Sequence, residues 1–97
     1  DWWCDDGIAA QTILLGAVEK GLGGCMIGSI NKEQLRQELD IPAHLKIRLV
    51  VALGKPAEQV KLEDLAPGGD IRYWRDKKDV HHVPKRTLAE LIVGEGE

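Results

Sequence analysis

The sequence predicts a single α+β domain that spans residues 1–97. Three observations predict it: a helix-forming stretch at 8–22 that glycines close, a β-branched run at 46–53, and capping sequences that open short helices at 31–39 and 87–92. With 43% hydrophobic and 30% charged residues, the composition is typical of one soluble globular unit. Helices and strands therefore share one fold.

The first helix is expected from Ile8 to Leu22. Asp5 and Asp6 before it are good N-cap residues, and Gly21 lies at its end, where glycine is the usual stop signal. Its apolar residues occupy almost the whole circumference, so the helix needs cover on nearly every side. A short chain does not supply that much cover, which favours an additional packing surface.

Four further segments follow from local patterns. The glycine-bounded apolar run at 24–30 (GCMIGSI) predicts a strand or extended segment, and the run at 46–53 (KIRLVVAL) predicts a buried central strand. Residues 55–70 hold prolines and glycines among charges and are expected to form a long surface loop. A short edge strand at 71–75 and a charged turn at 76–79 complete this part.

Two capping-box sequences open the remaining helices. Asn31 precedes Gln34 by three residues, and Thr87 precedes Glu90 by three, which is the spacing of an N-cap side chain and its reciprocal partner. Pro42 lies just beyond the end of the first of these helices. Both helices are therefore expected to be short.

Composition excludes several classes of function. A formal net charge of -3 and scattered basic residues give no electrostatic footprint for nucleic acid. No apolar run approaches the roughly 20 residues needed to cross a bilayer, so no membrane segment is expected. The spacing of Cys4 and Cys25 fits neither a zinc ribbon nor a redox pair, and we expect a cytoplasmic protein. The chain starts at Asp1 and enters a helix at once, which favours a domain cut in its middle.

Four motifs stand in order along the chain: DGIAAQTILLGA at 6–17, GLGGCMIG at 21–28, LGKP at 53–56 and HHVPKR at 81–86. Together they resemble the signatures of the nitroreductase family. The resemblance covers essentially the whole chain and implies a nitroreductase-like α+β fold, with a helix-rich dimer interface and an incomplete mixed or antiparallel sheet. It also implies that this is the C-terminal portion of such a domain, because the N-terminal half of relatives, with its Arg-x-Ser-type phosphate motif, is missing.

The same resemblance implies a function. Nitroreductases bind FMN and use NAD(P)H as co-substrate, and they pass hydride or electrons to nitroaromatics, quinones or similar small-molecule acceptors in a ping-pong cycle. No catalytic side chain is expected, because the cofactor carries the chemistry and the protein binds and orients it. Family members are homodimers with FMN at the subunit interface, so a second copy or the missing N-terminal half is the expected partner.

The segment at 24–31 suits an anionic or electron-rich ligand on its residues alone. Its backbone N–H groups are not screened by side chains, and a helix N-terminus adds partial positive charge. An ordinary strand-to-helix turn fits the same pattern. By the resemblance, Met26 and Ile27 contact the flavin ring, and the backbone of Gly28 and Ser29 donates hydrogen bonds near its reactive nitrogen.

A second candidate corner lies near the C-terminus. Lys85 and Arg86 follow Pro84, and such cations suit point-charge and bidentate contacts with a phosphate. By the resemblance, Arg86 first and Lys85 second hold the FMN phosphate; the charge pattern alone equally fits a solvated surface pair. His81 and His82 would point to opposite faces of a strand, so no metal site is expected.

Other chemically notable side chains carry weaker expectations. Cys25 is expected to be a buried, inert packing residue, and the role of Cys4 stays open. Trp2, Trp3 and Trp74 are expected to anchor a core or an interface rather than stack on a ligand. Two alternatives to the enzyme remain: a non-catalytic flavin-binding or dimerisation module, and, more weakly, a small α+β interaction protein without a cofactor.

Overall fold

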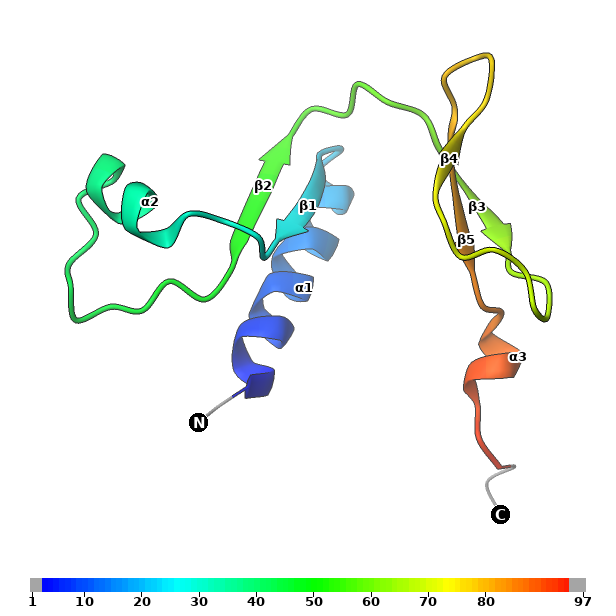
Figure 1. The fold of residues 1–97 in the computed structure, drawn as a ribbon, viewed down its shortest axis with the longest axis horizontal. Coiled ribbons are helices and arrows are strands. Elements are labelled where there is room, and N and C mark those ends of the chain that lie inside the picture. The colour runs from blue at the N-terminus through cyan, green and yellow to red at the C-terminus, as the bar shows by residue number, and fades with distance from the viewer. Residues whose placement is uncertain (1–2, 95–97) are drawn as a thin grey trace. The chain divides into compact units, whose positions relative to one another are not determined.

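The structure, a computed structural model, describes residues 3–94, with the backbone alone at Trp3. It is an α+β chain, as the sequence predicts. The elements fall in two compact units, Asp1–Pro56 and Ala57–Glu97. In chain order they are α1 (Trp3–Glu19), β1 (Gly23–Ile27), α2 (Lys32–Glu38), β2 (Val50–Gly54), β3 (Val60–Asp64), β4 (Trp74–Arg75), β5 (His81–Lys85) and α3 (Leu88–Leu91) (Figure 1).

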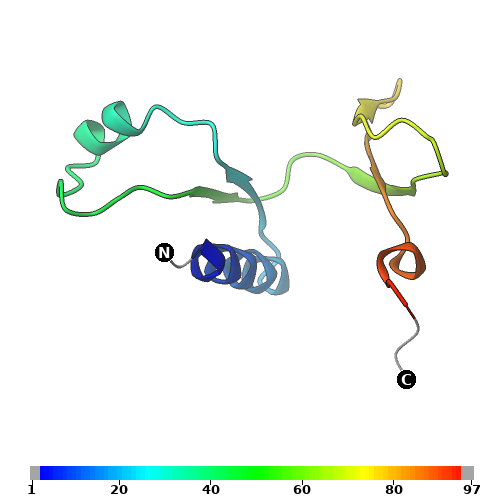
Figure 2. The ribbon, with the colours of Figure 1, turned by 60° about the horizontal axis from the view of Figure 1, so that its bottom comes forward.

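The first unit is built on an antiparallel ladder of β1 and β2, with α1 packed on one face (Figures 1 and 2). The register runs from Gly23 opposite Gly54 to Ile27 opposite Val50. Gly24 makes the packing possible: a Cβ at this position would meet Leu14 of α1 and lie 3.0 Å from a backbone oxygen of β2. The helix and the strand therefore approach as closely as only glycine permits.

Helix α1 begins earlier and ends earlier than expected. Because it starts at Trp3, the expected N-cap residues Asp5 and Asp6 lie within its first turn, where carboxylates favour the positive end of the helix dipole. Its end at Glu19 is a Schellman motif in which Gly21 has φ of +79° and donates its N–H to the Val18 carbonyl at 3.0 Å. The glycine stop signal is thus confirmed.

Helix α2 follows its predicted capping. The Asn31 side chain accepts a hydrogen bond from the Gln34 N–H at 3.1 Å. At the other end Asp40, with φ of +52°, takes the left-handed position that glycine usually fills. The Arg36 guanidinium donates to the Pro42 carbonyl at 2.8 Å, so the predicted stop at this proline also fixes the outgoing chain.

The expected central strand at 46–53 is corrected in two respects. Strand β2 begins only at Val50, because residues before it have no partner in β1, whose register ends at Ile27. The strand also pairs on one side only and is half-exposed, so it is an edge rather than a buried centre. The same lack of cover leaves Cys25 exposed on β1, against the expectation of a buried thiol.

The second unit holds a three-stranded sheet in the order β3-β5-β4, in which β5 runs parallel to β3 and antiparallel to β4. The expected loop at 55–70 is therefore wrong in its middle, where β3 alternates apolar and polar residues from Val60. Strand β5 was not predicted. The short β4 lies at the sheet edge, as expected, and the turn at 76–79 closes on Asp79 with φ of +61°.

Proline is unusual in a central strand, and the register explains its place here. The His81 N–H bonds to Gln59 on the β3 side, so alternate residues of β5 turn their N–H groups toward β4. Pro84 belongs to that second set but lies beyond the two residues that β4 pairs, so its missing N–H costs no ladder bond. Thr87 then caps α3, accepting from the Glu90 N–H at 3.4 Å as predicted. The expected fraying of the tail falls largely on residues outside the described range.

The described residues enclose little core. Buried side chains are Ala10, Ala17, Val83 and His82. The chain exposes 8587 Å², whereas two separate compact bodies of these sizes would together expose about 6,600 Å². Along the described part of the chain, no helix is both long enough and apolar enough to cross a bilayer.

The excess exposed surface includes one side of α1. Ala10 and Ala17 face the ladder, while Ile8, Leu15 and Val18 on the outer side are 64%, 62% and 66% exposed. The sequence predicts that other segments cover this helix on nearly every side, but the described residues leave the side that carries Ile8, Leu15 and Val18 exposed.

Candidate functional site

The glycine-edged corner between β1 and α2 consists of residues 28–31. A Cβ placed at Gly28 would have no neighbour within 4 Å, so the space beside its backbone is open. Within residues 3–94, no carbonyl or side chain accepts from the N–H groups of Gly28 and Ser29. Both donors are therefore available to a ligand. A cavity of about 360 Å³ adjoins the corner, and its lining includes Ile30, Asn31 and Val50.

Met26 and Ile27 precede the corner but do not share a face of the ladder. Since a Cβ at Gly24 would point at α1, the alternation of the strand puts Met26 on the helix side and Ile27 on the opposite side. Both side chains are partly exposed. The face that carries Ile27 is the one that α1 leaves free, so Ile27 is the better placed of the two to touch a flat ring beside the corner.

The cationic corner at the end of β5 belongs to the second unit. The Lys85 ammonium donates to the Tyr73 hydroxyl at 3.3 Å and lies 5.6 Å from the centre of the Tyr73 ring. Arg86 is exposed and makes no ion pair with any residue the structure describes. Arg86 is thus the freer of the two cations for an incoming anion.

Asp6 of the first motif has a structural partner. The Arg48 side chain donates to its carboxylate at 3.0 Å, and this hydrogen bond holds the pKa of Asp6 below its usual value. The pair ties α1 to the segment that leads into β2. It borders a largely apolar groove of about 470 Å³ between α1, α2 and residues 46–51.

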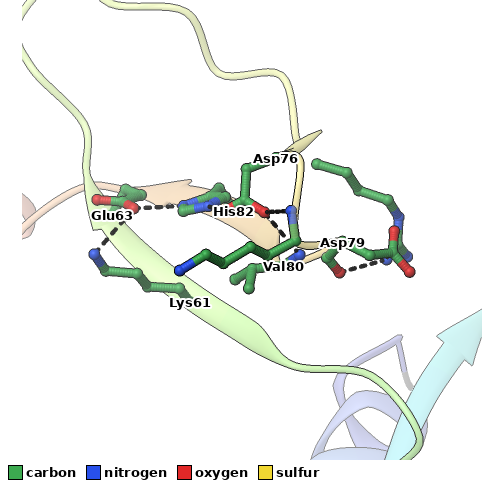
Figure 3. A network of polar contacts seen from close by, with 8 residues as sticks. Lys61, Glu63, Asp76, Asp79, Val80 and His82 are labelled. Carbon is green, nitrogen blue, oxygen red and sulfur yellow. Dashed lines mark hydrogen bonds and ion pairs between the residues drawn. The ribbon is translucent and has the colours of Figure 1, made fainter.

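A polar cluster that the sequence did not reveal lies in the second unit (Figure 3). His82 is only 7% exposed, and its two ring nitrogens lie 2.6 Å from a Glu63 carboxylate oxygen and 2.8 Å from an Asp76 carboxylate oxygen. The hydrogen bond to Asp76, and then the one to Glu63, raise the pKa of the His82 imidazole. The bond to His82 in turn lowers the pKa of each carboxyl group.

His81 and His82 point to opposite faces of β5, as predicted for neighbours in a strand. His81 packs edge-to-face on Tyr73, with ring centres 5.5 Å apart, whereas His82 stacks on Trp74 with ring centres 3.8 Å apart. Trp74 is 50% exposed and covers one face of His82, so it is not a core residue, and its expected role as an interface anchor stays a prediction. Trp2 lies outside the described residues.

The signal that could have found this cluster is the alternation at 60–64, where valine, lysine, leucine and glutamate follow one another. Pro56 before it and Pro67 after it favoured a loop instead. Even with the strand in hand, the pairing of Glu63 with His82 joins residues 19 positions apart and depends on a parallel register that local patterns do not encode.

Comparison with known proteins gives two findings. A family model described as "Nitroreductase family" matches residues 3–55, which is more than half of the chain. The chain is also similar to "Putative NAD(P)H nitroreductase YodC" of Bacillus subtilis (strain 168), with 27% identity over 67 residues. That alignment covers 69% of this chain and 33% of the relative, so the chain spans about a third of the length of the curated protein it matches.

Proposed function

Because the chain belongs to the nitroreductase family, a family of oxidoreductases, we propose that it is part of an FMN-dependent NAD(P)H oxidoreductase. The relative from Bacillus subtilis carries an NAD(P)H nitroreductase name, which supports the choice of co-substrate. Bound FMN supplies the hydride and electron chemistry that links NAD(P)H to a nitroaromatic, quinone or similar acceptor. The residues of this chain bind and orient that cofactor.

The observation that carries the proposal is the open corner after β1. Gly28 and Ser29 offer two backbone N–H donors that no described residue uses, beside a position with no neighbouring atoms. An electron-rich edge of a flavin ring can accept from both donors, and fixed donors of this kind stabilise charge that develops on a reacting ring. Ile27 adds apolar contact on the free face of the ladder, with Met26 as the weaker candidate.

Arg86 and Lys85 are the proposed phosphate ligands. Guanidinium and ammonium groups make charge-assisted hydrogen bonds to phosphate oxygens, each worth about 1.5–3 kcal/mol. Arg86 forms no ion pair with any described residue, and the ammonium of its sequence neighbour Lys85 donates to the Tyr73 hydroxyl.

A second subunit or the remaining part of the domain completes the site. Three features support this proposal. The chain spans about a third of the length of its relative. Its exposed area is roughly 2,000 Å² larger than the area expected for two compact bodies of these sizes, and the outer side of α1 is apolar. On one partner alone, that area exceeds the roughly 800 Å² that a standard interface buries per partner and corresponds to the larger, permanent interfaces. We propose a homodimer of the whole domain, with turnover dependent on segments beyond this chain.

The experiment is an FMN titration of the 97-residue chain, followed by flavin fluorescence, with NAD(P)H oxidation measured on the same sample. We expect binding that weakens about tenfold or more in the double variant Lys85→Ala and Arg86→Ala. The matched control is Lys77→Ala with Lys78→Ala, which removes a neighbouring exposed pair and leaves affinity unchanged. Equal loss in both double variants, or FMN affinity unaffected by the first, contradicts the phosphate role.

The same titration separates the alternative. If the chain binds FMN but does not oxidise NAD(P)H, the result favours a flavin-binding module, and turnover then requires the remaining part of the domain. Absence of FMN binding, both by the chain alone and after addition of the rest of the domain, refutes the flavin proposal.

A further inference from the structure

The cluster around His82 joins every strand of the second unit. His82 lies on the central strand β5, Glu63 comes from β3, and Asp76 begins the turn after β4 (Figure 3). Trp74 of β4 stacks on the imidazole with an angle of 5° between the ring planes. One buried side chain thus contacts both neighbours of its strand.

The geometry requires a particular protonation state. Each ring nitrogen of His82 faces a carboxylate oxygen at hydrogen-bond distance, and an ionised carboxylate can only accept. Both nitrogens must therefore donate, which only the imidazolium can do. A neutral imidazole has one N–H, so loss of the proton leaves one nitrogen lone pair against a carboxylate at less than 3 Å.

We propose that Glu63, His82 and Asp76 form a proton-dependent clamp that holds β5 between β3 and the turn after β4. Of the other charged groups near it, Lys61 lies 3.7 Å from the Glu63 carboxylate, whereas Asp79 pairs with Arg75. Lys61 balances one of the two carboxylates, so the cluster approaches neutrality only when His82 is charged.

The clamp matters because little else holds this sheet together. Strand β4 pairs with β5 through two residues only. Among the described residues after Pro56, the one buried apolar side chain is Val83. The parallel ladder of β3 and β5 is thus stabilised by backbone hydrogen bonds that water can reach unless the side-chain clamp excludes it. The same strand ends at Lys85, so the clamp also fixes the start of the cationic corner.

The pH dependence has two limits. The pKa of His82 is raised above its usual 6.5, so its contribution is complete below 6.5 and is lost as pH rises through the raised value. The pKa values of Glu63 and Asp76 are lowered from 4.5 and 3.8, so their contribution is complete above those values and is lost as pH falls through the lowered ones. The clamp is strongest between 4.5 and 6.5.

The test measures histidine titration and amide exchange by NMR on the 97-residue chain. We expect His82 to keep its proton to higher pH than it does in Glu63→Gln or Asp76→Asn. Exchange protection in β3 and β5, corrected for the intrinsic rate, should fall up to about tenfold per pH unit above 6.5 until His82 has titrated. Asp76→Asn keeps an oxygen for the backbone N–H groups of the turn, so it isolates the charge.

The control is Asp70→Asn, which neutralises an exposed carboxylate paired with Arg72 and leaves His82 untouched. It should leave both the titration and the protection as in the wild type. The clamp is overturned if His82 titrates alike in the wild type and both cluster variants. It is overturned equally if wild-type protection in β3 and β5 does not change as His82 loses its proton, a result that needs no variant to fold.

Discussion

The close approach of α1 to β1 at Gly24 predicts a sharp penalty for a single methyl group. In Gly24→Ala the new Cβ meets the Cδ2 atoms of Leu14 and Leu53, the latter at 2.7 Å, and lies 3.0 Å from the Ala52 carbonyl oxygen. The two leucine ends can move, but the carbonyl belongs to the paired strand and cannot move without breaking the ladder. The two leucine side chains, or the helix that carries Leu14, must therefore shift from their packed positions.

The magnitude follows from two opposing effects. Overpacking a close contact costs about 1–3 kcal/mol, and replacing glycine by alanine returns about 0.4–1 kcal/mol by restricting the unfolded chain. The net loss is about 1–2 kcal/mol of unfolding free energy. For a chain of this size each kcal/mol lowers Tm by about 4–8 °C. Circular dichroism at about 222 nm, which reports mainly on helices, follows unfolding during heating and in urea. In urea the free energy of unfolding of a small protein falls by roughly 1–3 kcal/mol per M of denaturant.

Gly28→Ala is the matched control, four residues further along the same segment. Its Cβ would meet nothing within 4 Å, so stability should stay within about 0.5 kcal/mol of the wild type, as for surface substitutions in general. The proposed flavin contact predicts instead that Gly28→Ala weakens FMN binding. If Gly24→Ala is as stable as Gly28→Ala, the close packing of α1 on β1 is wrong and the reasoning fails.

Four further substitutions test local features. Gly21→Ala places a side chain at φ of +79° and should lower the free energy of unfolding, measured in urea, by about 1 kcal/mol. Asp40→Gly relieves a φ of +52° and should raise that free energy by up to about 1 kcal/mol. Changes of the same sign in both variants would contradict the left-handed helix ends. Asn31→Ala removes the cap of α2 and should cost about 1 kcal/mol by the same assay, and no loss would mean that the cap hydrogen bond is not formed. Val18→Asp puts a charge on the exposed side of α1 and should reduce self-association in sedimentation without lowering helix content, while unchanged association would remove this side from the proposed interface.

Local signals were enough to predict the N-caps of α2 and α3 and the glycine that stops α1, although not the start of α1. Asn31 and Thr87 are caps because their short side chains reach back to an amide three residues on, and Gly21 stops α1 because it alone tolerates the left-handed turn. Each of these interactions is complete within one helical turn, so the neighbouring residues determine it. The family motifs are likewise patterns of neighbouring residues.

Pairings between distant segments were not predictable in this way. The prolines and glycines that flank β3 predict a loop there, and two histidines and a proline make β5 a poor strand by propensity. Tertiary pairing overrides those preferences, since Pro84 meets no partner strand on its N–H side. The extent of exposure was also unexpected: a β-branched run was assumed to be buried, yet β2 has a neighbour on one side only.

The proposed flavin contacts also divide into those that local sequence indicates and those that depend on the fold. The family resemblance selects Gly28 and Ser29, and the glycine pattern at 24–31 is compatible with an open backbone there because such a backbone needs no distant partner. Alternation in a strand then separates Met26 from Ile27, a distinction that the motif alone did not make.

The most direct measurement of the central claim is a nitrogen-15 NMR titration of the labelled chain with FMN. The account predicts that the amide signals of Gly28 and Ser29 shift as FMN is added, because their free N–H groups donate to the flavin ring. Amide signals of these two residues that stay in place at saturating FMN would contradict it.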